Sequence, residues 1–321
     1  MKHTVVPIAV SVAVFMIPSL IYARADRAFY HAIRYGATAK FTVKIVDDIK
    51  QPVGGVKIEA RFDPAFSAAG ELKTFVTDTN GMALVSGRTG KSVSVRATKN
   101  GYYGSTEEIG YVSMGQGVKG GMWQPLNMTR EIVLRPIKKP AAVKVPVGNW
   151  RIADATNQWI GFDIEKYDFV KPHGKGMIAD MDVRIDWDGR RWPNSTGMEV
   201  YIRFPEKYAG GYYQDRVMGS DFKDSYFALT NATYMKEFSF FEHPIRDARG
   251  DIERFEKKTF DLTKVLIVRS RCVLDENGRL KEARYCQISN FRFSCDDGGG
   301  CIMFQPIFNP TPNDTNLEPK R

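Results

Sequence analysis

From Lys40 onward, short runs of residues alternate between apolar and polar, and turn-forming residues separate these runs. In residues 40–46 (KFTVKIV), Phe41, Val43 and Ile45 fall on one side and the polar residues fall on the other. This period of two is typical of a β-strand with one buried face. The alternation recurs along the rest of the chain, for example in residues 56–62, 91–97, 198–204 and 284–293. The pattern predicts an all-β protein.

The composition fits a folded chain that is rich in sheets and turns. Hydrophobic residues make up 43% of the chain and charged residues 26%, which excludes disorder throughout. The 28 glycines and 16 prolines supply many turns. Because single cores rarely grow beyond about 250–300 residues, the length of 321 residues indicates two domains.

The first predicted domain covers residues 39–136. Its strands are expected at residues 40–46, 56–62, 74–78, 82–85, 91–97 and 130–134. Asn80-Gly81 is a strong signal for a tight turn between two of them. The segment Gly110–Gly121 contains five glycines and is expected to form an inserted loop. Short strands at this density predict a small β-sandwich.

Three segments of this domain, which combine turn residues with the starts or ends of strands, follow one another in a characteristic order. They are residues 52–58 (PVGGVKI), 77–83 (TDTNGMA), and 93–98 (VSVRAT) followed by 100–102 (NGY). The order resembles the carboxypeptidase regulatory-like, transthyretin-like domain of many exported bacterial proteins. The resemblance implies an immunoglobulin-like or transthyretin-like β-sandwich in which the Asp-x-Asn-Gly segment makes a hairpin turn. It also implies an accessory or scaffold role without catalytic residues.

A linker and a larger β-rich region follow. Prolines and cations in the linker, residues 137–148, predict an extended spacer. The region 149–310 is long enough for a single larger β-sandwich or a jelly roll. Within it, residues 206–213 are expected to form a Gly/aromatic loop, and residues 245–258 a charged, exposed excursion.

The C-terminal tail, residues 311–321, continues a segment that begins Phe308-Asn309-Pro310. Together with residues 285–293 (YCQISNFRF), it is similar to the ending of uncharacterised exported proteins from Verrucomicrobia-type bacteria. That similarity implies a shared architecture and no known activity. The tail is rich in Asn and Asp, whose side chains readily bond to the backbone, so we expect it to cap a sheet.

The N-terminal segment predicts export. Lys2 gives a positive start, residues 4–22 carry no charge, and residues 23–25 (ARA) form a small-x-small cleavage site. We therefore expect residues 1–25 to be a signal peptide and the mature protein to be secreted, periplasmic or bound to the cell envelope, with residues 26–38 as a lead-in. An uncleaved membrane anchor is the alternative, since about nineteen uncharged residues can span a bilayer.

All four cysteines lie in the last fifty residues, and an even number in an exported chain favours disulfides. The short segment between Cys295 and Cys301 predicts a hairpin that sets these two opposite each other. Cys272 and Cys286 are then paired by elimination, although the turn at residues 275–278 places Cys272 nearer Glu282. A zinc site is the competing interpretation, but the chain has no CxxC motif.

Alternating carboxylates in residues 180–188 suggest a possible site. Asp180, Asp182, Asp186 and Asp188 fall on one face of a predicted strand, with Arg184 among them. Such carboxylates can bind calcium or serve a glycosidase. The favoured interpretation, however, is a solvent-exposed face whose charges pair with the neighbouring strand.

Other signatures of catalysis are missing from the sequence. The histidines of the mature chain, His31, His173 and His243, lack the spacing of metal ligands. No GxSxG motif and no nucleotide-binding glycine motif occurs. No basic or aromatic pattern typical of nucleic-acid binding is present either. The sequence therefore predicts no catalytic residue, no metal, no cofactor and no nucleic-acid partner.

Aromatic residues give the best candidates for ligand binding. Tyr208, Tyr212 and Tyr213 lie in the predicted Gly/aromatic loop, where flat rings can stack on a ligand. Trp187 and Tyr201 lie on predicted strands and are expected to pack in the core. These observations favour a non-enzymatic exported binding or structural protein, with a glycan or another surface protein as its unknown ligand. The alternative is a secreted carbohydrate-active hydrolase that uses the set Asp186, Asp188 and Glu199.

Overall fold

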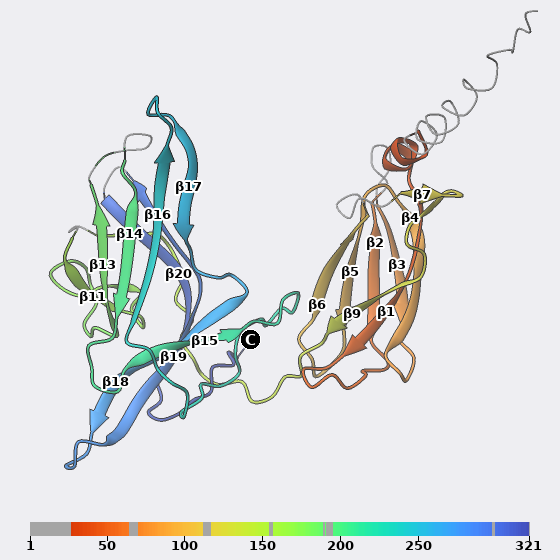
Figure 1. Ribbon diagram of the computed structural model, residues 1–321. Coiled ribbons are helices and arrows are strands. Elements are labelled where there is room, and N and C mark those ends of the chain that lie inside the picture. The colour runs from red at the N-terminus through yellow and green to blue at the C-terminus, as the bar shows by residue number, and fades with distance from the viewer. Residues whose placement is uncertain are drawn as a thin grey trace, which may run out of the picture. The chain divides into compact units, whose positions relative to one another are not determined.

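The computed structural model describes residues 27–63, 70–111, 117–153, 157–188, 190, 195–296 and 299–320. Most of these residues form strands. One helix, at residues 27–35 within the predicted lead-in, comes before the first strand (Figure 1). The all-β prediction is therefore confirmed. The predicted signal peptide, residues 1–25, lies outside the described residues. No helix in the described part of the chain is long and apolar enough to cross a membrane.

The chain forms two compact units. The first consists of Met1–Ile137 and Gly219–Phe222, and the second of Lys138–Met218 and Lys223–Arg321. The sequence boundary expected between the domains lies close to the boundary between these units. Each unit has a hydrophobic core of its own, and each is built from two sheets.

The two sheets of the first unit share one core. One sheet follows the order β4-β1-β8-β7, with β9 also paired to β1, and the other follows the order β3-β2-β5-β6. Alternate residues of β1, such as Phe41 and Val43, are fully buried against residues of the second sheet, such as Ile58 and Val95. The strands are β1 (Ala37–Val46), β2 (Lys57–Phe62), β3 (Glu71–Val76), β4 (Met82–Thr89), β5 (Ser92–Thr98), β6 (Ser105–Gly110), β7 (Val118–Lys119), β8 (Met122–Trp123) and β9 (Met128–Val133).

The turn at Asn80-Gly81 does not make the expected hairpin. β3 pairs with β2 and β4 pairs with β1, so the turn carries the chain from one sheet to the other. The Asp78 carboxylate accepts hydrogen bonds from the backbone N–H groups of Asn80 at 2.9 Å and Met82 at 2.8 Å. Gly81 has a φ of +74°, and a Cβ there would lie 2.4 Å from the carbonyl oxygen of Ile45. The turn signal was correct, but its role in strand pairing was wrong.

The second unit is a larger sandwich. Its six-stranded sheet follows the order β12-β11-β13-β14-β16-β17, and its five-stranded sheet follows β10-β20-β19-β18-β15 (Figure 1). The strands are β10 (Arg151–Ile152), β11 (Trp159–Asp163), β12 (Asp168–Phe169), β13 (Met181–Trp187), β14 (Met198–Arg203), β15 (Gly210–Asp215), β16 (Glu237–Arg246), β17 (Ile252–Lys258), β18 (Lys264–Leu274), β19 (Leu280–Asp296) and β20 (Gly299–Asn309).

Facing residues of these two sheets form one core. Val183 and Val200 of the six-stranded sheet are buried together with Ile288 and Phe304 of the five-stranded sheet. The alternation seen in the sequence therefore sends every second side chain of β13 and β14 inward. The residues between them, which include Arg184, point to the outer face of the six-stranded sheet.

Two segments of the second unit differ from the sequence-based expectation. The expected loop at residues 206–213 ends in strand β15, an edge strand that pairs with β18. The expected excursion at residues 245–258 is a hairpin in which β17 pairs with β16. Neither strand shows a clear alternation of apolar and polar residues, because β15 begins with two glycines and β17 is mostly charged. A Cβ at Gly210 would lie 2.7 Å from the backbone carbonyl oxygen of Met235, so the close approach of the two backbones requires glycine there.

The predicted linker is not a free spacer. The backbone N–H groups of Lys138 and Lys139 donate to the carboxylate of Glu318, at 3.0 and 2.7 Å. Further along, the backbone of Lys144 exchanges hydrogen bonds with Phe308 of β20 at 2.7 and 2.8 Å. Glu318 is fully buried. The C-terminal tail thus fixes the linker to the second unit.

The tail also caps a sheet, as its composition predicted. The side-chain oxygen of Asn313 accepts a hydrogen bond at 3.0 Å from the backbone N–H of Ala283, in β19. Leu317 is buried in a small second core with Tyr212 and Tyr285, on the other face of the five-stranded sheet. The tail therefore belongs to the packed structure of the second unit.

The predicted pair of Cys272 and Cys286 is wrong, because both are free thiols. In the register of β18 and β19, Cys286 lies opposite Val268, four residues before Cys272. Cys286 is fully buried in the main core, and Cys272 is partly buried beside it.

For the other predicted pair, the backbone register is shifted by one residue from the expected opposition. Cys295 pairs with Gly300, and Ser294 pairs with Cys301. The Cys301 thiol is 3.0 Å from the carbonyl oxygen of Ser294 and donates to it. The side chain of Cys295 lies outside the described residues, so a bond between Cys295 and Cys301 stays a prediction.

Candidate functional site

The outer face of the six-stranded sheet gathers aromatic and charged side chains in rows across neighbouring strands. One row runs from Trp159 on β11 through Arg184 on β13 and Tyr201 on β14 to Ser239 on β16. The core expectation for Tyr201 was wrong, because this residue lies on the same outward face as Arg184. Cross-strand neighbours in such a row lie about 5 Å apart. The row therefore places two half-buried aromatic rings beside polar side chains on one face of the sheet.

A cavity of about 370 Å³ lies along this row, and Trp159, Tyr201 and Ser239 are part of its lining. β17 pairs with β16 only from Phe241 onward, so in the described strands the first residues of β16 lack this neighbour. Aromatic residues from four strands line the cavity together with polar side chains. Its lining includes Trp159, Tyr201, Tyr213, Phe238, Glu237, Ser239 and Lys258. We refer to it as the aromatic cavity.

Arginines that form ion pairs also contact the aromatic rings of this face. The guanidinium of Arg203 lies 4.1 Å from the ring centre of Trp159, and the same group donates to Asp182 at 3.0 Å. This pair confirms the expectation that charges on residues 180–188 pair with the neighbouring strand. Arg184 lies 5.8 Å from the ring centre of Tyr201. The rings are thus positioned before any ligand arrives, which lowers the entropic cost of binding.

The three tyrosines predicted from the sequence do not form one site. Tyr213 lines the aromatic cavity, and burial followed by the nearby charge of Asp261 raises the pKa of its hydroxyl to about 12. Tyr212 points to the opposite face of β15, where it is buried and its hydroxyl accepts a hydrogen bond from Leu229 N–H at 2.7 Å. Tyr208 is half-buried and donates to the carbonyl of Gly278 at 3.1 Å. Only Tyr213 remains a candidate.

Sequence reasoning missed most of the cavity. Trp159 was not singled out, although it alternates outward beside Ile160 and Phe162, which are buried. That alternation was the available signal for an exposed aromatic residue on a strand. Glu237, Ser239 and Lys258 carry no comparable signal, because only the pairing of β14, β16 and β17 brings them together.

A second cavity, of about 360 Å³, contains the carboxylates proposed for a hydrolase. Its lining includes Asp186, Asp188, Glu199 and His243. Asp186 lies directly opposite Glu199 in the register of β13 and β14. The sequence was therefore right to group these three carboxylates, and the structure adds His243, whose Nε2 lies 3.2 Å from Glu199.

Each of the three carboxylates already has hydrogen-bond partners. Asp186 accepts two bonds from the Arg184 guanidinium, both at 2.6 Å. Glu199 accepts a hydrogen bond from the Tyr201 hydroxyl, and this bond is the main reason that the pKa of Tyr201 is raised. A glycosidase needs one carboxylic acid that stays protonated near neutral pH. Both carboxylate oxygens of Asp186 accept hydrogen bonds from Arg184, so neither is free to donate a proton to a substrate.

Asp188 serves the backbone of a turn. Its carboxylate accepts hydrogen bonds from the N–H groups of Arg190 at 3.0 Å and Thr196 at 2.8 Å. Partial burial alone would raise the pKa of Asp188, but these bonds outweigh it and lower the pKa. Asp188 therefore stabilises the loop that follows β13. No cluster of metal-ligating side chains occurs among the described residues.

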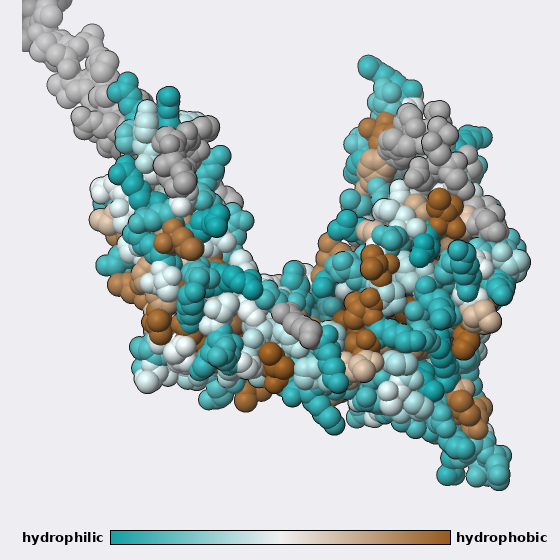
Figure 2. Space-filling model, turned by 180° about the vertical axis from the view of Figure 1, so that it is seen from behind, coloured by the Kyte–Doolittle hydropathy of each residue, from teal (hydrophilic) through white to brown (hydrophobic). Residues whose placement is uncertain are grey.

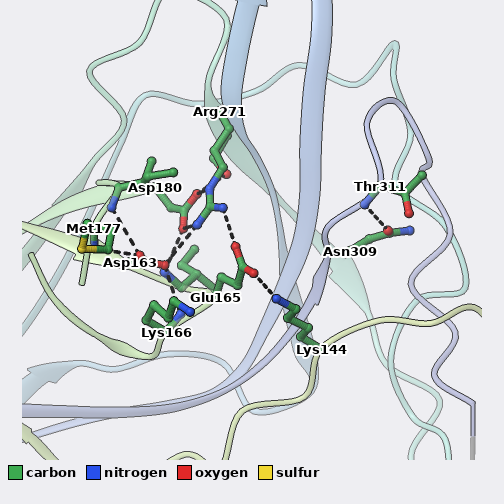
Figure 3. A network of polar contacts seen from close by, with 12 residues as sticks. Lys144, Asp163, Glu165, Lys166, Met177, Asp180, Arg271, Asn309 and Thr311 are labelled. Atoms are coloured by element: carbon green, nitrogen blue, oxygen red, sulfur yellow. Dashed lines mark hydrogen bonds and ion pairs between the residues drawn. The ribbon is translucent and has the colours of Figure 1, made fainter. Parts of the chain in front are cut away.

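The most extensive ionic network of the second unit lies elsewhere, around Arg271 (Figure 3). The guanidinium donates to Asp163 at 3.0 Å, to Glu165 at 2.5 Å and to Asp180 at 2.8 Å. Asp180 is buried, so its predicted place on a solvent-exposed face was wrong. Burial raises the pKa of Asp180 above its ordinary value, despite the opposing effect of Arg271.

Backbone groups complete this network. Asp163 accepts hydrogen bonds from the N–H groups of Lys166 and Met177, both at 3.0 Å, and Asp180 accepts one from Ile164 at 2.8 Å. The network thus joins the turn after β11 to the bulge of β18, where Arg271 has a φ of +50°. Its carboxylates are occupied by the fold, which indicates a structural role.

Comparisons with known proteins give no family. No protein-family model and no curated protein sequence matches the chain. Among solved structures, it is similar to the 3-chlorocatechol 1,2-dioxygenase of Rhodococcus opacus 1CP, with 12% identity, a TM-score of 0.26, and coverage of 32% of this chain and 62% of that one. The chlorocatechol 1,2-dioxygenase of Pseudomonas putida matches at 13% identity and a TM-score of 0.25, over 31% and 61% of the two chains.

A third solved structure covers more of the chain. It is a protein from Bacteroides uniformis ATCC 8492 provisionally described as carbohydrate-binding, with 10% identity, a TM-score of 0.18, and coverage of 86% of this chain and 98% of that one. The chain spans less than two thirds of the length of either dioxygenase. At these TM-scores, none of the three similarities supports an assignment of function.

Proposed function

We propose that the protein is an exported, non-enzymatic glycan-binding protein whose ligand occupies the aromatic cavity. The observation that carries this proposal is the joint lining of one cavity by Trp159, Tyr201 and Tyr213 together with Glu237, Ser239 and Lys258. Aromatic faces pack against the apolar faces of sugar rings, and a few convergent polar groups bond to hydroxyls. Export is proposed from the N-terminal segment, residues 1–25.

The arrangement of this face favours binding over hydrolysis. The aromatic rings are held by arginines, and the grouped carboxylates are held by Arg184, Tyr201 and backbone amides. Pre-positioned rings suit recognition of a ligand that is not changed. A non-catalytic role also accords with an accessory first domain, as the resemblance of residues 39–136 implies.

Substitution of Trp159 tests the proposal. A glycan array first identifies ligands of the purified chain, and isothermal titration calorimetry then measures their affinity. Trp159→Ala removes the largest ring of the cavity, so we expect affinity to fall by about 1–2 kcal/mol, or roughly tenfold. Trp150→Ala is the matched control, because Trp150 is 44% exposed and does not line the cavity; it should leave affinity unchanged.

The hydrolase remains the alternative because Asp186 faces Glu199 across β13 and β14. Incubation of each array ligand with the protein, followed by chromatography of the products, separates the two functions. Intact ligands after long incubation support a binding protein. Cleavage that Asp186→Asn abolishes would overturn the proposal.

A further inference from the structure

The first unit contains a basic cavity that its expected scaffold role does not use. Its volume is about 560 Å³, and its lining includes Lys57, Arg96, Thr98, Lys99, Asn100 and Tyr102. Lys57 on β2 lies directly opposite Thr98 on β5, so both residues share the outer face of the four-stranded sheet. The cations and hydrogen-bonding groups of this lining suit a polar ligand. Figure 2 shows one face of the chain, on which hydrophilic residues predominate and hydrophobic residues form separate patches.

Lys99 is held at the cavity by neutral groups. Its ammonium donates to the carbonyl of Gly54 at 2.6 Å and lies 5.7 Å from the ring centre of Tyr102. Among the described residues, no carboxylate contacts Lys99. A side chain at Gly55 would meet nothing within 4 Å, so the backbone there leaves room for a ligand. Within the part of the chain that the structure describes, Lys99 thus supplies a positive charge without an acid in contact with it.

The other two cations of the cavity are partly balanced. Lys57 pairs with Glu59 at 2.6 Å, and Arg96 pairs with Asp221 at 2.9 Å. The side chains of Lys57 and Arg96 are 54% and 45% exposed, and those of their acidic partners are 29% and 28% exposed, so both pairs are in contact with solvent. Exposed ion pairs are weak, so a ligand can compete for these cations.

The surrounding unit is also basic. Residues 27–137 contain 15 Lys and Arg against nine Asp and Glu, and Asp221 of the same unit lowers the sum from +6 to +5, whereas the whole chain carries +9. An excess of one sign attracts ligands of the opposite sign and raises their association rate. The basic character is thus concentrated in the unit that contains this cavity.

We propose that this cavity binds an anionic polysaccharide through its sulfate or carboxylate groups. Lys99, Lys57 and Arg96 provide cations for these groups, and Thr98 and Asn100 provide hydrogen-bonding groups for sugar hydroxyls. The half-buried ring of Tyr102 offers a flat face for a sugar. The first unit is then a second binding module, and this proposal stands independently of the aromatic cavity.

Titration of the full-length chain with charged and neutral oligosaccharides tests the proposal. The probes are a heparin fragment, which carries sulfates, an oligogalacturonate, which carries carboxylates, and neutral dextran. We expect binding of one or both anionic probes, weakening as salt rises, and no binding of dextran. Lys99→Gln should weaken binding about tenfold. The glutamine keeps a donor for the Gly54 carbonyl, so the fold is retained.

Two further variants make the test specific. Glu59→Gln releases Lys57 from its ion pair and should strengthen binding severalfold, which a misfolded variant would not do. Lys119→Ala removes an exposed lysine outside the cavity and should have less than a twofold effect. Equal losses in Lys99→Gln and Lys119→Ala would overturn the proposal, because binding would then depend only on total charge.

Two other results would also overturn it. One is binding of neither anionic probe. The other is binding of a DNA duplex as tightly as the oligosaccharides, which would indicate a general affinity for polyanions. Trp159→Ala, the test variant for the aromatic cavity, should leave binding of the anionic probe unchanged. The two proposed sites are therefore tested by different variants and ligands, so one proposal can fail while the other holds.

Discussion

At the scale of single residues, the surroundings of Cys272 and Cys286 determine how reactive their thiols are. Burial, followed by the nearby charge of Glu206, raises the pKa of the Cys272 thiol to about 12. Burial also raises the pKa of Cys286 well above its ordinary value. Since the thiolate is the reactive form, both thiols are expected to be inert in the folded protein near neutral pH.

We predict that iodoacetamide at pH 8 leaves Cys272 and Cys286 unmodified in the native protein and modifies both after denaturation in urea. Peptide mass spectrometry measures the extent of labelling at each cysteine. Rapid labelling of Cys272 without urea would contradict the structure. So would recovery of a Cys272–Cys286 disulfide-linked peptide from the native, unreduced protein.

The sequence predicted the directions of some side chains of the candidate site correctly and others incorrectly. The outward set Asp182, Arg184 and Asp186 followed from alternation alone, and the ion pair between Asp182 and Arg203 agrees with it. Tyr212 was misplaced because residues 206–213 were interpreted as a loop, and a loop gives no rule for direction. Once β15 is known, alternation sends Tyr212 and Tyr213 to opposite faces.

At the scale of secondary-structure elements, strands were easier to predict than their partners. Alternation locates most strands to within a few residues, because it depends on local burial. Pairing depends on contacts between distant segments, so the turn at Asn80-Gly81 was assigned to a hairpin although β3 and β4 join different sheets. For the same reason, the Arg271 network was invisible: its acids lie more than 90 residues before the arginine.

Glu165 gives this network a pH dependence. Burial alone would raise the pKa of Glu165, but hydrogen bonds from Lys144 and Arg271 outweigh it and lower the pKa below the ordinary value of 4.5. A carboxyl group whose pKa is lower in the folded state stabilises the fold fully above its unfolded pKa. It loses this contribution as the pH falls through its folded pKa.

We therefore predict that Glu165→Gln lowers the free energy of unfolding by about 2 kcal/mol at pH 7, since hydrogen bonds to a charged group are lost. The difference between wild type and variant should shrink as the pH falls below about 4.5. Urea denaturation at a series of pH values measures it. Glu282→Gln is the control, because Glu282 is more exposed and its carboxylate lies 3.9 Å from Arg284. A difference independent of pH would show that Glu165 acts through packing rather than charge.

At the scale of the whole molecule, the linker and the tail change the expected organisation. The sequence predicted an extended, solvated spacer at residues 137–148, because prolines favour extended backbone and cations favour contact with water. In the structure, residues from Lys138 onward belong to the second unit, and Glu318 binds the backbone of Lys138 and Lys139. Composition cannot reveal this contact, since it joins segments separated by about 180 residues.

The contact predicts where a protease can cut. Proteases need a segment that detaches from its hydrogen bonds, and the backbone at Lys138 and Lys144 is bonded to Glu318 and Phe308. We expect trypsin to spare both lysines in the wild-type chain. Glu318→Ala removes the acceptor for the Lys138 and Lys139 amides, so cleavage after Lys138 should accelerate at least tenfold. Timed digestion followed by mass spectrometry measures this rate.

The rate at a second site shows whether the effect is local. Lys144 is bonded to Phe308 rather than to Glu318, so its cleavage should accelerate less than cleavage after Lys138. Glu276→Ala, at a remote exposed turn, should change neither rate. Equal cleavage after Lys138 in wild type and Glu318→Ala would mean that the tail does not hold the linker. Residues 137–148 would then behave as the free spacer that their composition suggests.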